Sequence, residues 1–144
     1  MAVQTTYNDG TLIAAASGGN HAGSPCRTVI TGVYDATRKN VVSGDSIPII
    51  NIPAGTIVEN VVLEVVTGQA TVTFAIGLTG GTTDGYLAAT TVATAGTKTA
   101  GTTGTYIADG VGDLYATADQ LDLLVGAATA STCVIKVHAI CTIV

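Results

Sequence analysis

Two consecutive apolar runs, residues 56–67 and 70–78, constrain the fold of this chain more than any other feature. In the second run apolar side chains recur at every second position, as at Val72, Phe74 and Ile76, which is the period of a strand with one buried face. The first run is apolar on both faces, so we expect a central strand whose second face is covered by another layer or another chain. Strict alternation places Ile57, Val61, Leu63 and Val65 on one face and Val58, Asn60, Val62, Glu64 and Val66 on the other.

Only Gly68 and Gln69 separate the two runs. A two-residue connection between strands is typical of a hairpin with glycine at a positive φ. We therefore expect a hairpin here, with the rest of the fold built around it.

The remaining chain reads as further short strands separated by turn residues. Strands are expected near residues 27–34, 45–52, 105–108, 121–125 and 132–143, with a long loop at 79–90 whose Tyr86 and Leu87 fold back onto the core. Pro48 places its strand at a sheet edge or bulge, because proline cannot donate to the ladder. About eight short strands with Gly-rich turns predict an all-β chain, a single-domain antiparallel β-sandwich or jelly-roll-like barrel.

The division of the chain follows from where this periodicity begins. Residues 1–25 carry turn signals such as Asn8-Asp9-Gly10 and little alternation, so they are expected to form an extended N-terminal arm. Residues 26–144 form the predicted β-sandwich domain. The arm either becomes ordered when it binds a neighbouring molecule or is a disordered terminus.

Composition limits the partners. Only 10% of residues are charged while 47% are apolar, with a mean hydropathy of +0.53, so burial between subunits is expected. No apolar run reaches the roughly 18–20 residues that span a bilayer, so no membrane is expected as a partner. A net charge of −5 argues against nucleic acid, which needs a basic footprint.

The cysteines predict buried free thiols. Cys133 and Cys141 lie in one expected strand, about 26 Å apart at roughly 3.3 Å per residue, too far for a disulfide. Whether Cys26 is paired stays open. The Cys and His spacing predicts no metal site.

No arrangement of side chains predicts catalysis or a cofactor. His21 and His138 lie far apart and outside any motif. Alternation places Glu59 and Glu64 on opposite faces of one strand, so they are not expected to work as a carboxylate pair. The chain is therefore predicted to have no catalytic residues, no metal and no cofactor.

Candidate contact residues are found instead. Arg27, Arg38 and Lys39 supply three of the five basic residues and could dock on an acidic partner, although solvated turn charges are the simpler interpretation. Val62 and Val65 on the central strand are candidates for contacts between subunits. The predicted capsid or subunit contacts are therefore Arg27, Arg38, Lys39, Val62 and Val65.

Five segments together resemble small β-sandwich structural proteins of tailed bacteriophages, in particular capsid decoration (cement) proteins. They are Ile52–Thr56, Ala70–Gly77, Asp84–Thr90, Ala118–Leu123 and Val134–Val137. The resemblance covers roughly residues 45–144 and leaves the arm out. It implies a non-enzymatic protein, made in the host cytoplasm, that sits on the outer surface of the virion capsid, binds the major capsid protein and forms a homo-oligomer, a trimer first of all.

The alternative is a tail or head fibre component that binds a receptor or carbohydrate. Carbohydrate stacking needs exposed aromatic rings, and the chain has only five Tyr, one Phe and no Trp. The composition therefore favours decoration over the fibre.

Overall fold

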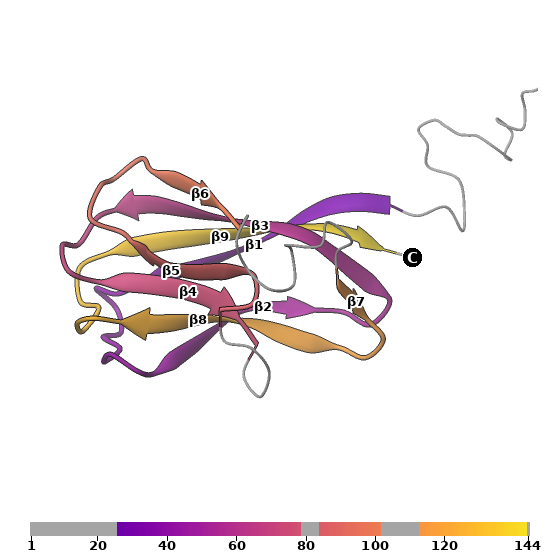
Figure 1. Ribbon diagram of the computed structural model, residues 1–144, viewed down its shortest axis with the longest axis horizontal. Helices are drawn as coiled ribbons and strands as arrows, with labels where there is room; N and C mark the ends of the chain where they lie inside the picture. The colour runs from indigo at the N-terminus through magenta and orange to yellow at the C-terminus, as the bar shows by residue number, and fades with distance from the viewer. Residues whose placement is uncertain (1–25, 79–83, 102–112, 144) are drawn as a thin grey trace, which may run out of the picture.

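The computed structural model describes residues 26–78, 84–101 and 113–143, and within them the chain forms two antiparallel sheets packed face to face (Figure 1). This confirms the predicted all-β sandwich. The described part of the chain contains no helix long and apolar enough to cross a membrane.

Nine strands make up the described sheets. The five-stranded sheet has the order β1-β9-β3-β6, and β7 pairs with β3 outside that path. The four-stranded sheet has the order β2-β8-β4-β5. The strands are β1 (Cys26–Asp35), β2 (Ser46–Ile52), β3 (Thr56–Thr67), β4 (Thr73–Gly77), β5 (Leu87–Thr91), β6 (Lys98–Ala100), β7 (Asp113–Tyr115), β8 (Asp119–Gly126) and β9 (Val134–Ile143).

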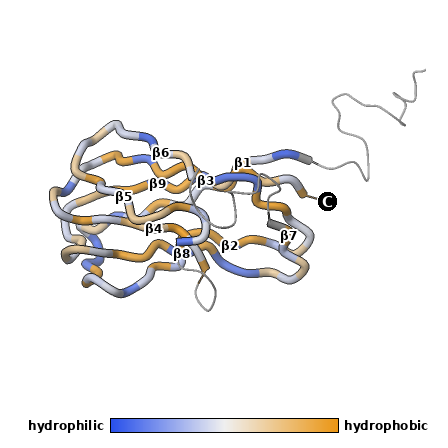
Figure 2. Tube along the Cα trace, in the orientation of Figure 1, coloured by the Kyte–Doolittle hydropathy of each residue, from blue (hydrophilic) through white to orange (hydrophobic). Residues whose placement is uncertain are grey.

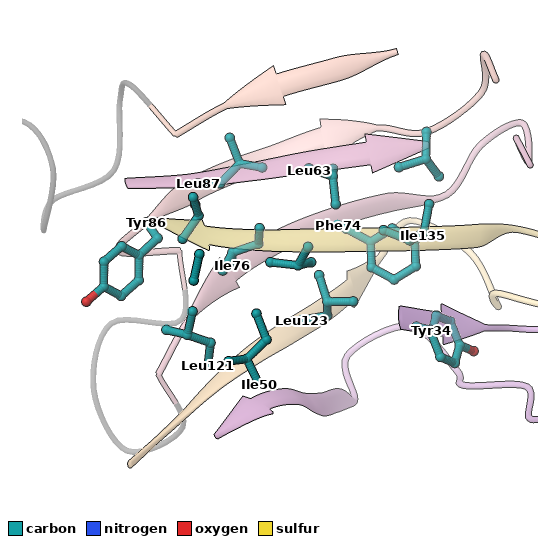
Figure 3. Close-up of a cluster of buried hydrophobic side chains, with 14 of the residues drawn as sticks. Tyr34, Ile50, Leu63, Phe74, Ile76, Tyr86, Leu87, Leu121, Leu123 and Ile135 are labelled. Atoms are coloured by element: carbon teal, nitrogen blue, oxygen red, sulfur yellow. The ribbon is translucent and has the colours of Figure 1, made fainter. Parts of the chain in front are cut away.

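The core lies between the two sheets, where side chains from both meet (Figure 3). Figure 2 shows hydrophobic residues gathered along the strands that cross the middle of both sheets. Tyr34 packs edge-on against Phe74, with ring centroids 6.1 Å apart. Tyr86 is fully buried and its hydroxyl lies 2.8 Å from that of Tyr115. The predicted packing of Tyr86 and Leu87 into the core is confirmed, although Leu87 already begins β5 instead of ending a long loop.

The predicted hairpin between β3 and β4 is wrong, because the two strands lie in different sheets. Strand β3 is central, as predicted, with β9 along one edge and β6 and β7 along the other, so no edge is left for β4. The chain instead crosses to the second sheet, and the positive φ falls on Thr71, at 70°, not on Gly68. The short connection between β8 and β9 is likewise a crossing and not a hairpin, since these two strands lie in different sheets.

The faces predicted for β3 are also wrong in part. The register with β9 shifts between Val58 and Asn60, so an extra residue enters the strand at a bulge. Val58 therefore faces the core together with Val61, Leu63 and Val65, while Ile57 faces away from it. The same shift puts Glu59 and Glu64 on one face, contrary to the prediction from alternation.

Strands β1 and β2 are edge strands of different sheets, and they approach each other along one side of the sandwich. Pro48 lies in β2 beside a register shift, which confirms its predicted edge or bulge position. At Gly32 the approach is so close that a Cβ atom would lie 2.3 Å from the carbonyl oxygen of Ile49. The predicted arm at 1–25 and the predicted strand at 105–108 lie outside the described residues.

Candidate contact surfaces

The side of the five-stranded sheet that faces away from the core, here called the outer face, is the first candidate. Alternation on β9 turns His138 and Ile140 outward, and the ladder sets them beside Val62 and Asn60 of β3. Val29 of β1 lies opposite Ile140 and is 56% exposed. The outer face thus presents half-buried and exposed aliphatic side chains in the middle of a sheet that no described strand covers.

Most charged groups on the outer face are paired within it, and Lys136 lies opposite Glu64 in the ladder without forming an ion pair. Glu59 forms an ion pair with Arg27 at 2.8 Å and accepts a hydrogen bond from the Thr142 hydroxyl. Glu64 lies 2.8 Å from His138 Nε2 and 3.9 Å from Lys98 Nζ. These pairs leave little net charge to oppose the approach of an apolar partner.

Glu64 is held in its ionised form by its neighbours. The hydrogen bond from His138 lowers the pKa of the Glu64 carboxyl, partial burial opposes this, and the positive charges of Lys98 and Lys136 add to the lowering. Thr31 Oγ1 lies 2.9 Å from the other ring nitrogen of His138 and so fixes the ring in place. This constellation orders the outer face; it does not resemble an acid–base pair facing a substrate cavity.

The second candidate is an open groove of about 690 Å³ between the end of β1 and the start of β2, here called the β1–β2 groove. Aliphatic residues form much of its lining, and Arg38 and Lys39 stand at the turn that joins the two strands. Its lining residues are Val33, Tyr34, Asp35, Arg38, Lys39, Val41, Ser46, Ile47 and Pro48.

The turn that carries the two cations is anchored by backbone hydrogen bonds. Val41 exchanges two of them with Ala130, and Gly44 donates to the carbonyl of Val125 at 2.8 Å. The buried Tyr34 donates its hydroxyl to the Lys39 carbonyl at 2.6 Å. Burial raises the pKa of Tyr34, so this donor stays protonated. The cations are thus presented from a fixed backbone.

The predicted contact residues separate into three places. Arg38 and Lys39 lie together at the β1–β2 groove, whereas Arg27 is paired with Glu59 at the other end of β1. Val62 lies half-buried on the outer face. Val65 is 2% exposed and packs in the core, where a partner cannot reach it while the sandwich stays closed.

Residue patterns alone did not single out the apolar lining of the groove. Two signals for it exist in the sequence: alternation along β1 sets Val33 opposite the buried Tyr34, and Pro48 marks an edge strand. The sequence does not reveal that two edge strands from different sheets pack side by side, and this packing forms the groove.

The described residues offer little for chemistry. They contain no group of three or more His, Cys, Asp or Glu side chains that could hold a metal ion. Cys133 and Cys141 are free and buried, as predicted, and burial raises the pKa of both thiols, which keeps them unreactive. The side chain of Cys26 lies outside the described residues.

No protein-family model and no curated protein matches this chain. Solved structures do match it. One chain of the cyanophage Pam1 capsid asymmetric unit superposes with a TM-score of 0.64 at 23% identity, covering 91% of this chain and 94% of that one.

Two further matches are also chains from phage capsid structures. One comes from the acid-stable capsid of Helicobacter pylori bacteriophage KHP30, with a TM-score of 0.59, 14% identity, and coverage of 83% of this chain and 92% of that one. The other comes from the capsid of Ralstonia phage GP4, with a TM-score of 0.56, 20% identity, and coverage of 94% and 93%. At these identities the likeness establishes a shared fold.

Proposed function

We propose that this chain is a non-enzymatic virion structural protein, a capsid decoration protein that binds the outer surface of a phage head and stabilises the shell. The observation that carries the proposal is the near-complete mutual coverage with chains from three phage capsids. Because each matched chain is covered almost end to end, each is itself a chain of about this length and not a larger shell subunit matched in one domain.

The charge of the chain supports the outer surface over the inner one. A protein that lines the inside of a filled head faces densely packed nucleic acid, which repels an acidic surface. This chain carries a net charge of −5, and Arg27 and Lys98 form ion pairs with Glu59 and Glu64. An exterior position avoids that repulsion.

The strand order supports a jelly roll, as a finer description of the sandwich. The orders β1-β9-β3-β6 and β2-β8-β4-β5 set β1 and β2, β9 and β8, β3 and β4, and β6 and β5 in equivalent places in the two sheets. Such double-sheet jelly rolls are common in viral capsid domains.

For assembly we propose a homo-oligomer, a trimer first of all, with residues 1–25 as an arm outside the sandwich domain of residues 26–144. Val62 on the outer face is the proposed subunit contact, because aliphatic side chains there lack a covering layer among the described strands. Three linked copies would bind a shell far more tightly than one, since each contact raises the effective concentration of the next.

The test is the mass of the purified protein in solution, followed by mixing with bare capsids and imaging. We expect a trimer that coats the shell at regular positions. A protein that ignores capsids and sediments with tails or host cells would overturn decoration and favour the fibre alternative, with its receptor or carbohydrate partner.

A further inference from the structure

The β1–β2 groove brings together two basic side chains, Arg38 and Lys39, that lie beside no glutamate of the described residues. The Arg38 side chain is 86% exposed and its Nε lies 3.7 Å from Asp35 Oδ2, a distant and solvated pair. Lys39 makes no ion pair with any described residue, whereas Arg27 and Lys98 each have a glutamate partner. Lys136 makes no ion pair either, but it lies opposite Glu64 in the ladder and its charge helps to lower the pKa of that carboxyl. On a chain with a net charge of −5, Arg38 and Lys39 thus form a local positive site.

The acidic residue in the groove does not cancel that site. Asp35 already accepts hydrogen bonds from the Thr37 backbone amide at 3.0 Å and from the Thr37 hydroxyl at 2.6 Å. These hydrogen bonds, the side-chain one above all, lower the pKa of Asp35. Asp35 therefore stays ionised with Oδ1 engaged in the turn, and its single negative charge offsets only one of the two positive charges of Arg38 and Lys39.

The position of the groove beside an open strand edge suits an extended chain. The groove runs between two edge strands, and within the described residues β1 pairs with a strand only on its β9 side. Its walls carry aliphatic side chains, with Val33 56% exposed and Ile47 half-buried, while Pro48 removes one backbone donor from the opposite edge. An added strand would therefore pair with the end of β1 beyond Gly32, where β1 and β2 touch, and rest its side chains on these walls.

We infer that the β1–β2 groove binds an extended peptide segment with alternating acidic and aliphatic residues, belonging to the shell protein on which this chain sits. Arg38 and Lys39 bind the carboxylates, and Val33, Ile47 and Pro48 contact the aliphatic side chains. The backbone hydrogen bonds at Val41 and Gly44 hold the turn in place beforehand, so little ordering is needed on binding. A carbohydrate fits less well, because the aromatic residue of the lining, Tyr34, is only 6% exposed.

This inference rests on the proposed function for the source of the peptide but not for its chemistry, so two arms test it. In the first, the full chain is titrated with a short capped peptide of alternating glutamate and valine and followed by NMR. We expect shifts confined to the groove, saturation, and weaker binding at high salt. The same peptide with lysine in place of glutamate should bind about tenfold more weakly or not at all.

In the second arm, bare capsids are mixed with the double variant Arg38→Gln/Lys39→Gln. The control is Ala89→Glu/Gln120→Glu, which changes exposed positions on β5 and β8; removing two positive charges or adding two negative ones takes the net charge from −5 to −7 in either case. We expect the groove variant to bind shells about tenfold more weakly than the control, because two charged contacts are lost.

Each outcome has a distinct meaning. If the unaltered protein coats capsids and the groove variant coats them equally well, or both variants lose binding alike, the groove inference is overturned while decoration stands. If the unaltered protein ignores capsids, decoration fails and the peptide arm alone decides the groove. If both peptides bind equally, or neither shifts groove residues, acidic recognition is overturned.

Discussion

At the scale of single residues, Gly32 closes one side of the sandwich. It is the point at which β1 and β2 come within contact, and the neighbour a side chain would meet is a backbone carbonyl, which cannot rotate away as a side-chain tip can. Glycine is needed here for close approach and not for an unusual φ.

Gly32→Ala should therefore destabilise the fold by about 3 kcal/mol, at the upper end for an inserted methyl group in a packed interior. Chemical denaturation measures the change. Gly44→Ala is the matched control: it has open space around it but a φ of 98°, so its cost should be limited to about 1 kcal/mol of backbone strain. Equal costs for the two variants would show that the close approach at Gly32 relaxes freely.

Glu64 makes the outer face sensitive to acid. Because its folded pKa lies below the ordinary value of 4.5, through the hydrogen bond from His138 first, the stability it contributes is complete above that value and is lost as pH falls through the lowered folded pKa. Glu64→Gln should thus be less stable than the unaltered protein at neutral pH, with the two melting temperatures converging in acid. Parallel curves across the whole range would contradict this.

At the scale of elements, the connection between β3 and β4 is the feature that most needs explaining. Its Gln69 is joined to the loop between β8 and β9: Oε1 accepts from the backbone amides of Ser131 and Thr132 at 2.9 Å each, and Nε2 donates to the Thr129 carbonyl at 2.8 Å. One side chain thus ties together two crossings between the sheets.

Gln69→Ala should cost about 2 kcal/mol, because three hydrogen bonds go and two amides lose their acceptor. Gln120→Ala is the control: its side chain makes one 3.3 Å hydrogen bond, to Asn51 on an exposed surface, and its loss should cost well under about 1 kcal/mol. Urea unfolding compares the two. A neutral Gln69→Ala would mean that water replaces the lost contacts at that loop.

At the scale of the whole molecule, folding and assembly depend on opposite faces of β3. Val65→Asp places a carboxylate in the core and should destabilise by about 4 kcal/mol or more, enough to unfold a marginal domain. Val62→Asp changes the half-buried outer face and should cost only about 1 kcal/mol. Circular dichroism should show a folded Val62→Asp protein.

Sedimentation then separates the two roles. We expect Val62→Asp to remain folded but to shift toward monomer, because a charge enters the proposed subunit contact. A folded Val62→Asp protein with the same mass as the unaltered one would place the subunit contact elsewhere.

Several features of this protein were decided by the sequence itself. The two-residue period of a strand accounts for the alternation on β9, the central place of β3 and the inward side chains of Leu121, Leu123 and Val125. The missing amide of proline accounts for the edge position of Pro48. These properties depend on residues that are close in the sequence, so the sequence pattern predicts them. The all-β fold follows from the number of such strand segments along the chain.

Only the tertiary structure decided which strands pair and which side chains share a surface. The short Gly68-Gln69 connection favours a hairpin by itself. The chain crosses to the other sheet instead because β9, far along the chain, takes the edge of β3 that a hairpin needs. One bulged residue in β3 then reversed the faces on its N-terminal side and brought Glu59 onto the face of Glu64. The β1–β2 groove likewise exists because edge strands from two sheets meet, and pairing at long range is not encoded in any single segment.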